Sequence, residues 1–423
     1  MVLRMTPFPL SKSIGSDPTG NLDHSGPGLL LWVFGGAFVG VFFFLRDFLR
    51  LDGLTVAHEV MWGRDFINVW TAGHILREGK IEILYDLAAY HRFQEALIGT
   101  VLGRHNFSYP PLTLPLTLPF AYLPYLAALA AWLVSTGGLF VYAARPFLKD
   151  SRLSAWAALA TPAAIVNIWA GHYGFLIGAI WLAAWHALDN HPRRAGILFG
   201  LLAIKPHIAV LVPIVLMLRR QWRVCAIAAA TVGVLVALSI VFFGIAPWRE
   251  YLTVTTGQQA RMIDAGRAFF HMMSTSTATA MLQLGAPWAL AMAAQSAMAA
   301  LGLCFVVVAA RSQATTASLA FLTATATFLV LPYAFNYDLT VVTLGAALLM
   351  TRNWQNLNTA EQCMVVAGFL SAQIGMFLAA FGAPIMPLML AGLALVQLRL
   401  VQRAGSLTCF GAAPAAAAAA RSI

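Results

Sequence analysis

Half of the carboxylates in this chain lie in one polar stretch, residues 46–111, directly after the first apolar segment. Eight of the sixteen acidic residues are there: Asp47, Asp52, Glu59, Asp65, Glu78, Glu82, Asp86 and Glu95. A carboxylate in a site can take a proton from a reacting hydroxyl group. A connector between two membrane segments can be far shorter than this stretch, so we predict a catalytic or binding loop here.

Asp65 has the most informative context of these carboxylates. It follows Trp62, Gly63 and Arg64 and precedes apolar residues at three- and four-residue spacing, which is typical of an amphipathic helix on a membrane surface. The apolar positions are Phe66, Val69, Trp70, Gly73 and Leu76. Asp65 is therefore either the N-cap of this helix or a functional carboxylate, and one residue can serve both roles.

Two more charged residues lie within or beside apolar segments. Lys205 is inside such a segment, where an ammonium group costs at least about 2.5 kcal/mol unless it reaches water or an anionic partner. A phosphate would be such a partner, whereas snorkelling to the interface needs no ligand. Asp338 follows Asn336 and Tyr337 and begins another apolar segment, so it either caps that helix or belongs to a site.

The other candidate ligands do not indicate a metal site. His172, His207 and His271 have no recognised ligand spacing, and no Asp-x-Asp motif occurs. We interpret these histidines as hydrogen-bonded or interfacial side chains. The four cysteines are far apart, without Cys-x-x-Cys spacing, and are interpreted as packing residues: Cys225, Cys304, Cys363 and Cys409.

The composition places the chain among polytopic helical membrane proteins. Hydrophobic residues make up 60% of the sequence and charged residues 10%, against about 25% charged residues in soluble domains. Lys and Arg in cytoplasmic connectors explain the net charge of +10, so nucleic acid is excluded as a partner. The sequence is polar through Ser25, has no cleavage pattern of a removed signal, and then enters a retained anchor at 28–45.

An all-α fold with about ten full membrane spans is predicted from segments of roughly 20 apolar residues. The segments are 29–45, 125–144, 153–169, 173–188, 224–244, 287–310, 318–332, 338–350, 362–380 and 387–401. Two further segments are broken, because 111–124 has four prolines and 195–218 contains Lys205, Pro206 and His207. Backbone leaves the helix at membrane depth only where it is buried in protein or lines a wet cavity. Both segments are therefore predicted to be paired half-helices or re-entrant elements.

Basic residues in short loops set the predicted orientation, because cytoplasmic loops collect Lys and Arg. The clusters are Arg145, Lys149 and Arg152; Arg193 and Arg194; Arg219, Arg220 and Arg223; and Arg399 and Arg403. Placing them inside gives a cytoplasmic tail at 1–28, one transmembrane domain at 29–401 and an Ala-rich cytoplasmic tail at 402–423. The loop 46–110, with its amphipathic helices, and the loop 245–285 then lie outside.

Five polar segments converge on the outer face in this topology. They are the loop with Asp65, the turn 171–173, the loop 245–285, the segment 336–338 and the break at 205–207, which points toward that face. Because these segments are separated in sequence, their convergence predicts a site rather than a simple connector.

The motifs in these segments, taken in order, resemble glycosyltransferase family 87 over most of the chain, from about residue 29 to residue 400. They are Asp65-Phe-Ile-Asn-Val-Trp70, Leu84-Tyr85-Asp86, Ser108-Tyr109-Pro110-Pro111, Leu123-Pro124, Gly171-His-Tyr-Gly174, Ala195-Gly196 and Ile204-Lys205-Pro206. The family consists of membrane glycosyltransferases of the GT-C type and includes a polyprenol-phosphate-mannose-dependent alpha-mannosyltransferase of phosphatidylinositol mannoside assembly.

The resemblance implies transfer of a hexose, most simply mannose, from a polyprenyl-phosphate sugar to a lipid or glycan acceptor, with inversion, at the outer face of the inner membrane. Asp65 corresponds to the general base, and Lys205 and the loop around Asp338 border the donor pocket. The phosphate needs cations, which Lys205, Arg64, Arg261 and Arg267 can supply. The expected pocket also includes Tyr109, His172, His207, His271, Asn336, Tyr337 and Asp338. Phosphate is a good leaving group, so a general acid is less necessary. Because no Asp-x-Asp motif occurs, we predict a metal-independent reaction without a cofactor.

Two other classes of protein share parts of this pattern. A transporter or lipid flippase also has broken helices and buried charge, but it is expected to have repeated halves and no carboxylate-rich outer loop. A polymer ligase of glycan assembly, with a different leaving group, fits the same architecture. Turnover of a polyprenyl-phosphate sugar in detergent separates an enzyme from a transporter, because detergent leaves no compartments.

Overall fold

The computed structural model describes residues 29–410 except 58, 104, 150, 152, 256, 259–260, 262 and 264–267. The tail 1–28, residues 411–423 of the C-terminal tail, Arg152 and the candidate phosphate ligand Arg267 lie outside the described residues. Within that part of the chain the fold is helical, apart from one isolated bridge and a small antiparallel sheet of β1 (Leu51–Asp52), β2 (Thr55–Val56) and β3 (Val60–Met61). The all-α fold class is confirmed.

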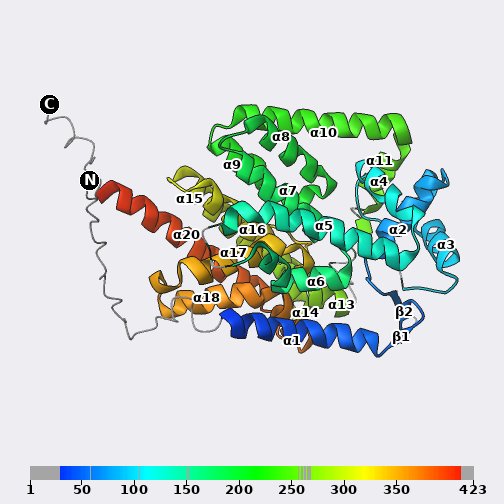
Figure 1. The fold of residues 1–423 in the computed structure, drawn as a ribbon, viewed down its shortest axis with the longest axis horizontal. Coiled ribbons are helices and arrows are strands. Elements are labelled where there is room, and N and C mark those ends of the chain that lie inside the picture. The colour runs from blue at the N-terminus through cyan, green and yellow to red at the C-terminus, as the bar shows by residue number, and fades with distance from the viewer. Residues whose placement is uncertain are drawn as a thin grey trace, which may run out of the picture.

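The helices form one bundle with the elements of the loop 46–110 at one end. They are α1 (Leu29–Phe48), α2 (Phe66–Arg77), α3 (Leu87–Ile98), α4 (Leu114–Thr117), α5 (Tyr125–Leu148), α6 (Pro162–Ala170), α7 (Gly174–Ala187), α8 (Pro192–Leu201), α9 (Val212–Leu218), α10 (Trp222–Phe243), α11 (Ala246–Glu250), α13 (Ala268–Met273), α14 (Thr277–Gln283), α15 (Trp288–Arg311), α16 (Thr316–Val330), α17 (Thr340–Arg352), α18 (Thr359–Leu370), α19 (Met376–Ala380) and α20 (Met386–Phe410). In Figure 1 the strands, α2, α3, α4 and α11 gather at the right, beyond the ends of α1, α5 and α10.

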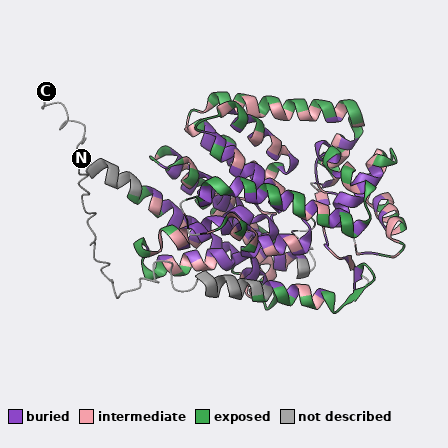
Figure 2. Ribbon diagram, viewed as in Figure 1, coloured by how far each residue is buried: buried purple, intermediate pink, exposed green. Residues whose placement is uncertain are grey.

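Four helices are long and apolar enough to cross a membrane: Tyr125–Leu148, Trp222–Phe243, Trp288–Arg311 and Thr359–Ala380. Shorter apolar helices lie at Gly174–Ala187, Pro206–Leu218, Thr316–Val330 and Thr340–Arg352. Figure 2 shows α10 exposed or intermediate over nearly its whole length along one edge of the bundle, with the central helices buried. An exposed apolar helix of 22 residues needs an apolar solvent, so the chain is embedded in a membrane. The ten crossings stay a prediction.

Both proline-containing segments are broken as predicted. Residues 111–122 form η2 (Pro111–Thr113), α4 and η3 (Leu118–Tyr122) in place of one helix. Between α8 and α9 lie two short 3₁₀ turns, η5 (Leu202–Ile204) and η6 (Pro206–Ala209), with Lys205 between them in a non-helical conformation. Proline removes a backbone donor, which interrupts the helical hydrogen bonding in 111–122 although Leu114 and Leu118 keep helical dihedrals. Proline also disfavours helical dihedrals in the residue before it, which explains the conformation of Lys205.

The continuous span predicted at 153–169 is wrong. The segment is divided into a 3₁₀ helix, η4 (Ala155–Ala160), and α6, with Thr161 in an extended conformation between them. The cause is Pro162, which restricts Thr161 and takes the first position of α6. The break shortens α6 and ends it at Ala170, beside the turn that carries His172.

The amphipathic surface helix predicted after Asp65 is also wrong, because α2 is buried in protein on all sides from Phe66 to Ile75. The proline-rich segment 111–124 covers the face that periodicity assigned to the membrane. Trp70 donates from its indole N–H to the carbonyl of Leu123 at 3.1 Å. A Cβ at Gly73 would lie 2.5 Å from the carbonyl oxygen of Thr117. The loop 46–110 is therefore part of the packed protein.

Replacing Asp86 is expected to destabilise α3. The Asp86 carboxylate accepts hydrogen bonds from the backbone N–H groups of Ala88 at 3.0 Å and Ala89 at 3.1 Å, which caps the helix. Asp86→Ala is expected to lower the free energy of local unfolding of α3 by about 1 kcal/mol, measured by hydrogen exchange of its amides. Asp86→Asn, which keeps the cap, is the matched control. Equal protection in both variants would contradict the prediction.

Candidate active site

A cavity of about 990 Å³ lies among the loop 46–110, the turn after α6, the break between α8 and α9, and the segment before α17. It brings together eight of the residues predicted from the sequence, and these come from segments far apart in the chain. They are Arg64, Asp65, Tyr109, His172, Lys205, His207, Arg261 and Tyr337. A cavity of this size, lined by several ionisable groups, is what a small-molecule site requires.

Three of the other predicted residues do not line the cavity. Asp338 is buried behind Lys205. Asn336 is fully buried, and its amide donates to the carbonyl of Ala372 at 2.6 Å, which anchors the segment before α17 to the π-helix η10 (Ser371–Gly375). His271, in α13, packs beside the ring of Phe270. These residues support the walls, and Asp338 reaches the site only through its partner.

The buried cation Lys205 has an anionic partner within the protein. Its ammonium group lies 2.5 Å from Oδ2 of Asp338, and the two side chains are only 6% and 2% exposed. The ammonium also lies 5.2 Å from the ring centroid of Tyr337. Lys205 therefore does not snorkel, and Asp338 does not cap α17, whose first residue follows Leu339 and which has no side-chain cap. The pair presents a charge-balanced lysine to the cavity.

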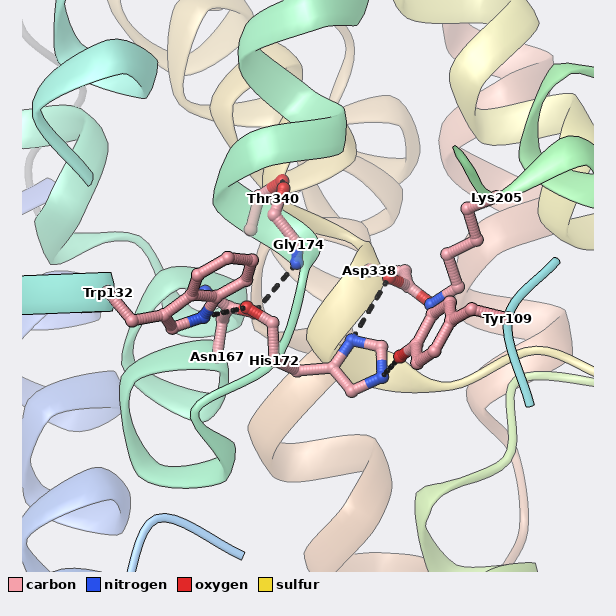
Figure 3. Close-up of polar contacts among 8 residues, drawn as sticks. All are labelled: Tyr109, Trp132, Asn167, His172, Gly174, Lys205, Asp338 and Thr340. Atoms are coloured by element: carbon pink, nitrogen blue, oxygen red, sulfur yellow. Dashed lines mark hydrogen bonds and ion pairs between the residues drawn. The ribbon is translucent and has the colours of Figure 1, made fainter. Parts of the chain in front are cut away.

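His172 connects this pair to Tyr109 of the loop 46–110 (Figure 3). Its Nε2 lies 2.6 Å from the hydroxyl oxygen of Tyr109, and its Nδ1 lies 3.8 Å from Oδ1 of Asp338. Burial holds the pKa of His172 well below its usual range, and the charge of Lys205 lowers it further. The imidazole is therefore neutral at physiological pH. In the tautomer with the hydrogen on Nδ1, which faces the Asp338 carboxylate, Nε2 accepts from the Tyr109 hydroxyl group.

The turn that carries His172 is fixed by a glycine. The backbone N–H of Gly174 donates to the side-chain oxygen of Asn167 at 3.0 Å, and its carbonyl accepts from the hydroxyl of Thr340 at 3.0 Å (Figure 3). A Cβ at position 174 would overlap the carbonyl oxygen of Tyr337. Only glycine allows this close approach, which places His172 beside the residues before α17.

Asp65 lies at the start of α2 but does not use its side chain as a cap. Its backbone N–H donates to the carbonyl of Ala170 at 3.0 Å, which ties the residue to the end of α6. The carboxylate is 32% exposed and lines the cavity, and the imidazole of His105 lies 3.7 Å from it. The N-cap alternative is therefore not supported, and the carboxylate is available to a ligand.

His105 is a cavity residue that the sequence analysis did not single out. It lies in an extended segment held by two contacts: the N–H of Gly103 donates to the carbonyl of Glu59 at 2.6 Å, and His91 lies 2.7 Å from the side-chain oxygen of Asn106. No spacing in the sequence links this segment to Asp65. The one feature of the sequence that could have indicated it is the polar pair His105-Asn106 inside the predicted catalytic or binding loop.

Two of the three arginines predicted to bind phosphate are among the described residues, and their surroundings differ. Arg64 lies 2.8 Å from the carboxylate of Asp47, and its guanidinium carbon lies 4.0 Å from the ring centroid of Trp169. Arg261 is exposed, lines the cavity, and donates to the carbonyl of Gly257 at 3.3 Å. In the part of the chain that the structure describes, no three His, Cys, Asp or Glu side chains are grouped as a metal site would require.

Comparison with known proteins gave one match. The sequence model of glycosyltransferase family 87 matches residues 107–332, more than half of the 423 residues. The matched region includes the turn with His172, the break at Lys205 and all helices from α5 to α16. No curated protein and no solved structure matched the chain significantly.

Proposed function

The chain belongs to glycosyltransferase family 87 and is a membrane glycosyltransferase, and from this premise we propose its donor, its acceptor and its catalytic residues. The donor is a polyprenyl-phosphate hexose, with mannose as the sugar. The acceptor is a lipid or a glycan at the outer face of the inner membrane, and the anomeric configuration is inverted. The observation that carries the proposal is that a carboxylate without a cap bond, Asp65, and a buried lysine, Lys205, line one cavity.

Asp65 is the general base of the proposed reaction. It takes the proton from an acceptor hydroxyl as that oxygen attacks the anomeric carbon from the face opposite the phosphate. The bond between the anomeric carbon and the phosphate oxygen breaks, and the electron pair leaves with the phosphate. One base is sufficient, because the departing phosphate needs no proton at the moment of bond cleavage.

Lys205 and Arg261 stabilise the phosphate in this proposal. Negative charge grows on the phosphate as the bond breaks, and charge-assisted hydrogen bonds from an ammonium or guanidinium group become stronger as it grows. Because Asp338 already neutralises Lys205 in part, the pair supports a donor phosphate with one negative charge better than a diphosphate with two. This favours a lipid monophosphate donor. The polymer ligase with a diphosphate leaving group is therefore the weaker alternative.

The proposed donor class is tested with purified protein in detergent. A synthetic short-chain polyprenyl-phosphate mannose and a membrane lipid extract are expected to yield a mannosylated product, and the matching polyprenyl diphosphate sugar is expected to be inert. EDTA is expected to change the rate by less than about twofold, because electrostatic contacts from the side chains replace a metal in this scheme. Transfer from the diphosphate alone would support the ligase alternative, and transfer of another hexose alone would correct the sugar.

A further inference from the structure

Asp47 is a buried carboxylate that the proposed reaction does not use. It is 2% exposed and lies in the last turn of α1, where the helix dipole disfavours a negative charge. Its Oδ1 accepts from Arg46 at 2.7 Å, and its Oδ2 accepts from Arg64 at 2.8 Å and from the indole N–H of Trp169 at 2.9 Å. Partners from α1, the turn before α2 and α6 therefore hold the charge of Asp47, which lies at the wall of the cavity.

The segment that Asp47 holds has an unfavourable backbone conformation. Gly63 has φ +80° and Arg64 has φ +42°, so two successive residues are left-handed immediately before Asp65. Glycine adopts this conformation freely, whereas arginine does so only where surrounding contacts hold it. For Arg64 these contacts are its ion pair with Asp47 and its position over the Trp169 ring.

The same turn is pressed against the end of α6. The N–H of Asp65 donates to the carbonyl of Ala170 at 3.0 Å, and a Cβ at Gly171 would lie 2.6 Å from the carbonyl oxygen of Gly63. Gly171 is also left-handed, with φ +62°, so both turns need glycine at their contact. The ends of α1 and α6 and the start of α2 thus meet beside the one carboxylate that we propose as base.

We propose that Asp47, Arg64 and Trp169 form a positioning device, here named the Asp47 latch, that sets the direction of the Asp65 carboxylate. This inference rests on the proposed function, because it assigns Asp65 the role of base. It also gives Arg64 a role different from phosphate binding, since its guanidinium group is engaged by Asp47 and Trp169. Asp47 acts through Arg64 and is a positioning residue, not a catalytic one.

The first test separates catalysis from donor binding. Asp47→Asn is expected to lower kcat on the order of 10²-fold, the effect of misplacing a catalytic group by about 1 Å. The KM for the donor is expected to stay unchanged, and Asp47→Glu is expected to restore part of kcat. The control is Asp52→Asn, an exposed aspartate of the same loop that does not line the cavity. Unchanged kcat in folded Asp47→Asn would overturn the latch.

A double-variant cycle distinguishes the latch from phosphate binding by Arg64. If the two residues act as one unit, Asp47→Asn with Arg64→Gln is expected to lose no more activity than the worse single variant. If the two single losses of activity multiply in the double variant and Arg64→Gln raises the KM for the donor, Arg64 would be assigned to phosphate binding instead. Trp169→Phe removes one N–H donor and keeps a ring. It serves as the milder variant if Asp47→Asn does not fold, with an expected loss of kcat at constant KM.

Hydrogen exchange tests the latch without a measurement of activity, so the latch and the proposed function can fail separately. In Asp47→Asn, hydrogen exchange is expected to become faster at the amides of Arg64, Asp65 and Phe66, which bond to Met61, Ala170 and Gly63. Exchange of α3 is expected to stay as in the wild type. Unchanged exchange at residues 64–66 would overturn the latch. Faster exchange in a protein that transfers no polyprenyl-phosphate sugar would support the latch and reject the proposed donor.

Discussion

Asp65→Asn is expected to lower the rate of sugar transfer by about 10³-fold, because the amide keeps the size of the side chain but cannot take the proton of the acceptor hydroxyl. The carboxylate makes no cap bond, and the backbone contact of Asp65 to Ala170 does not depend on the side chain. We therefore expect a folded variant with an unchanged donor KM. The measurement is kcat and KM for a polyprenyl-phosphate mannose, with thermal unfolding of both proteins beside it.

Asp86→Asn is the matched control for this substitution. Asp86 is an exposed aspartate of the same loop, and asparagine caps a helix as well as aspartate does. Its rate is expected to stay within about twofold of wild type. If Asp65→Asn keeps more than about a tenth of the rate, a different group takes the proton. His105, whose imidazole lies 3.7 Å from the Asp65 carboxylate, would then be the first candidate.

The break at Lys205 was predictable from the sequence, whereas its partner was not. A lysine inside an apolar segment carries the cost of a buried charge, and the proline after it removes a backbone donor. The local sequence is therefore sufficient to predict the break. Asp338 is 133 residues away, and no periodicity connects the two positions. The contact between them speaks against snorkelling of Lys205 and capping by Asp338, whereas a role of either residue in a site stays a prediction.

The error at α2 has a different origin. Three-and-four spacing identifies an apolar stripe, and a stripe beside a membrane segment indicates a surface helix. Periodicity does not state what covers the opposite face, and here the segment 111–124 does so through contacts of Trp70 and Gly73. The prolines of that segment were recognised as breaks. The packing of this segment over α2 is a tertiary contact, and no local sequence pattern indicates it.

The same limit explains why the role of Asp47 was not predicted. The concentration of carboxylates identified the loop, and Asp47 was among them, but its position in the last turn of α1 does not distinguish it from a solvated acid. Its function in the fold depends on Arg64 and on Trp169, which is 122 residues further along the chain. Residue type and density thus predicted a site in this loop, and contacts between distant residues are the basis for the roles that we propose.

Breaking the Lys205–Asp338 pair is expected to have the largest effect on stability. Each side chain is almost fully buried, so Lys205→Met leaves an unpaired carboxylate and Asp338→Asn an unpaired ammonium group. Either change is expected to lower the free energy of unfolding by about 3–5 kcal/mol. Unfolding in detergent, by denaturant or heat, measures it. Lys80→Met is the control, because Lys80 pairs with Glu78 at the surface at 2.8 Å, where a pair contributes less than about 1 kcal/mol.

The double variant, Lys205→Met with Asp338→Leu, separates the stabilising role of the pair from its role at the phosphate. Apolar residues of similar volume can replace a buried ion pair at little cost, so the double variant is expected to unfold within about 1 kcal/mol of wild type. Its transfer rate is nevertheless expected to fall on the order of 10²-fold or more, because no cation at position 205 stabilises the departing phosphate. Recovery of both stability and rate would show that the pair is purely structural. Recovery of stability alone assigns Lys205 to the reaction, since the fold would then be intact and only the charge facing the cavity would be missing.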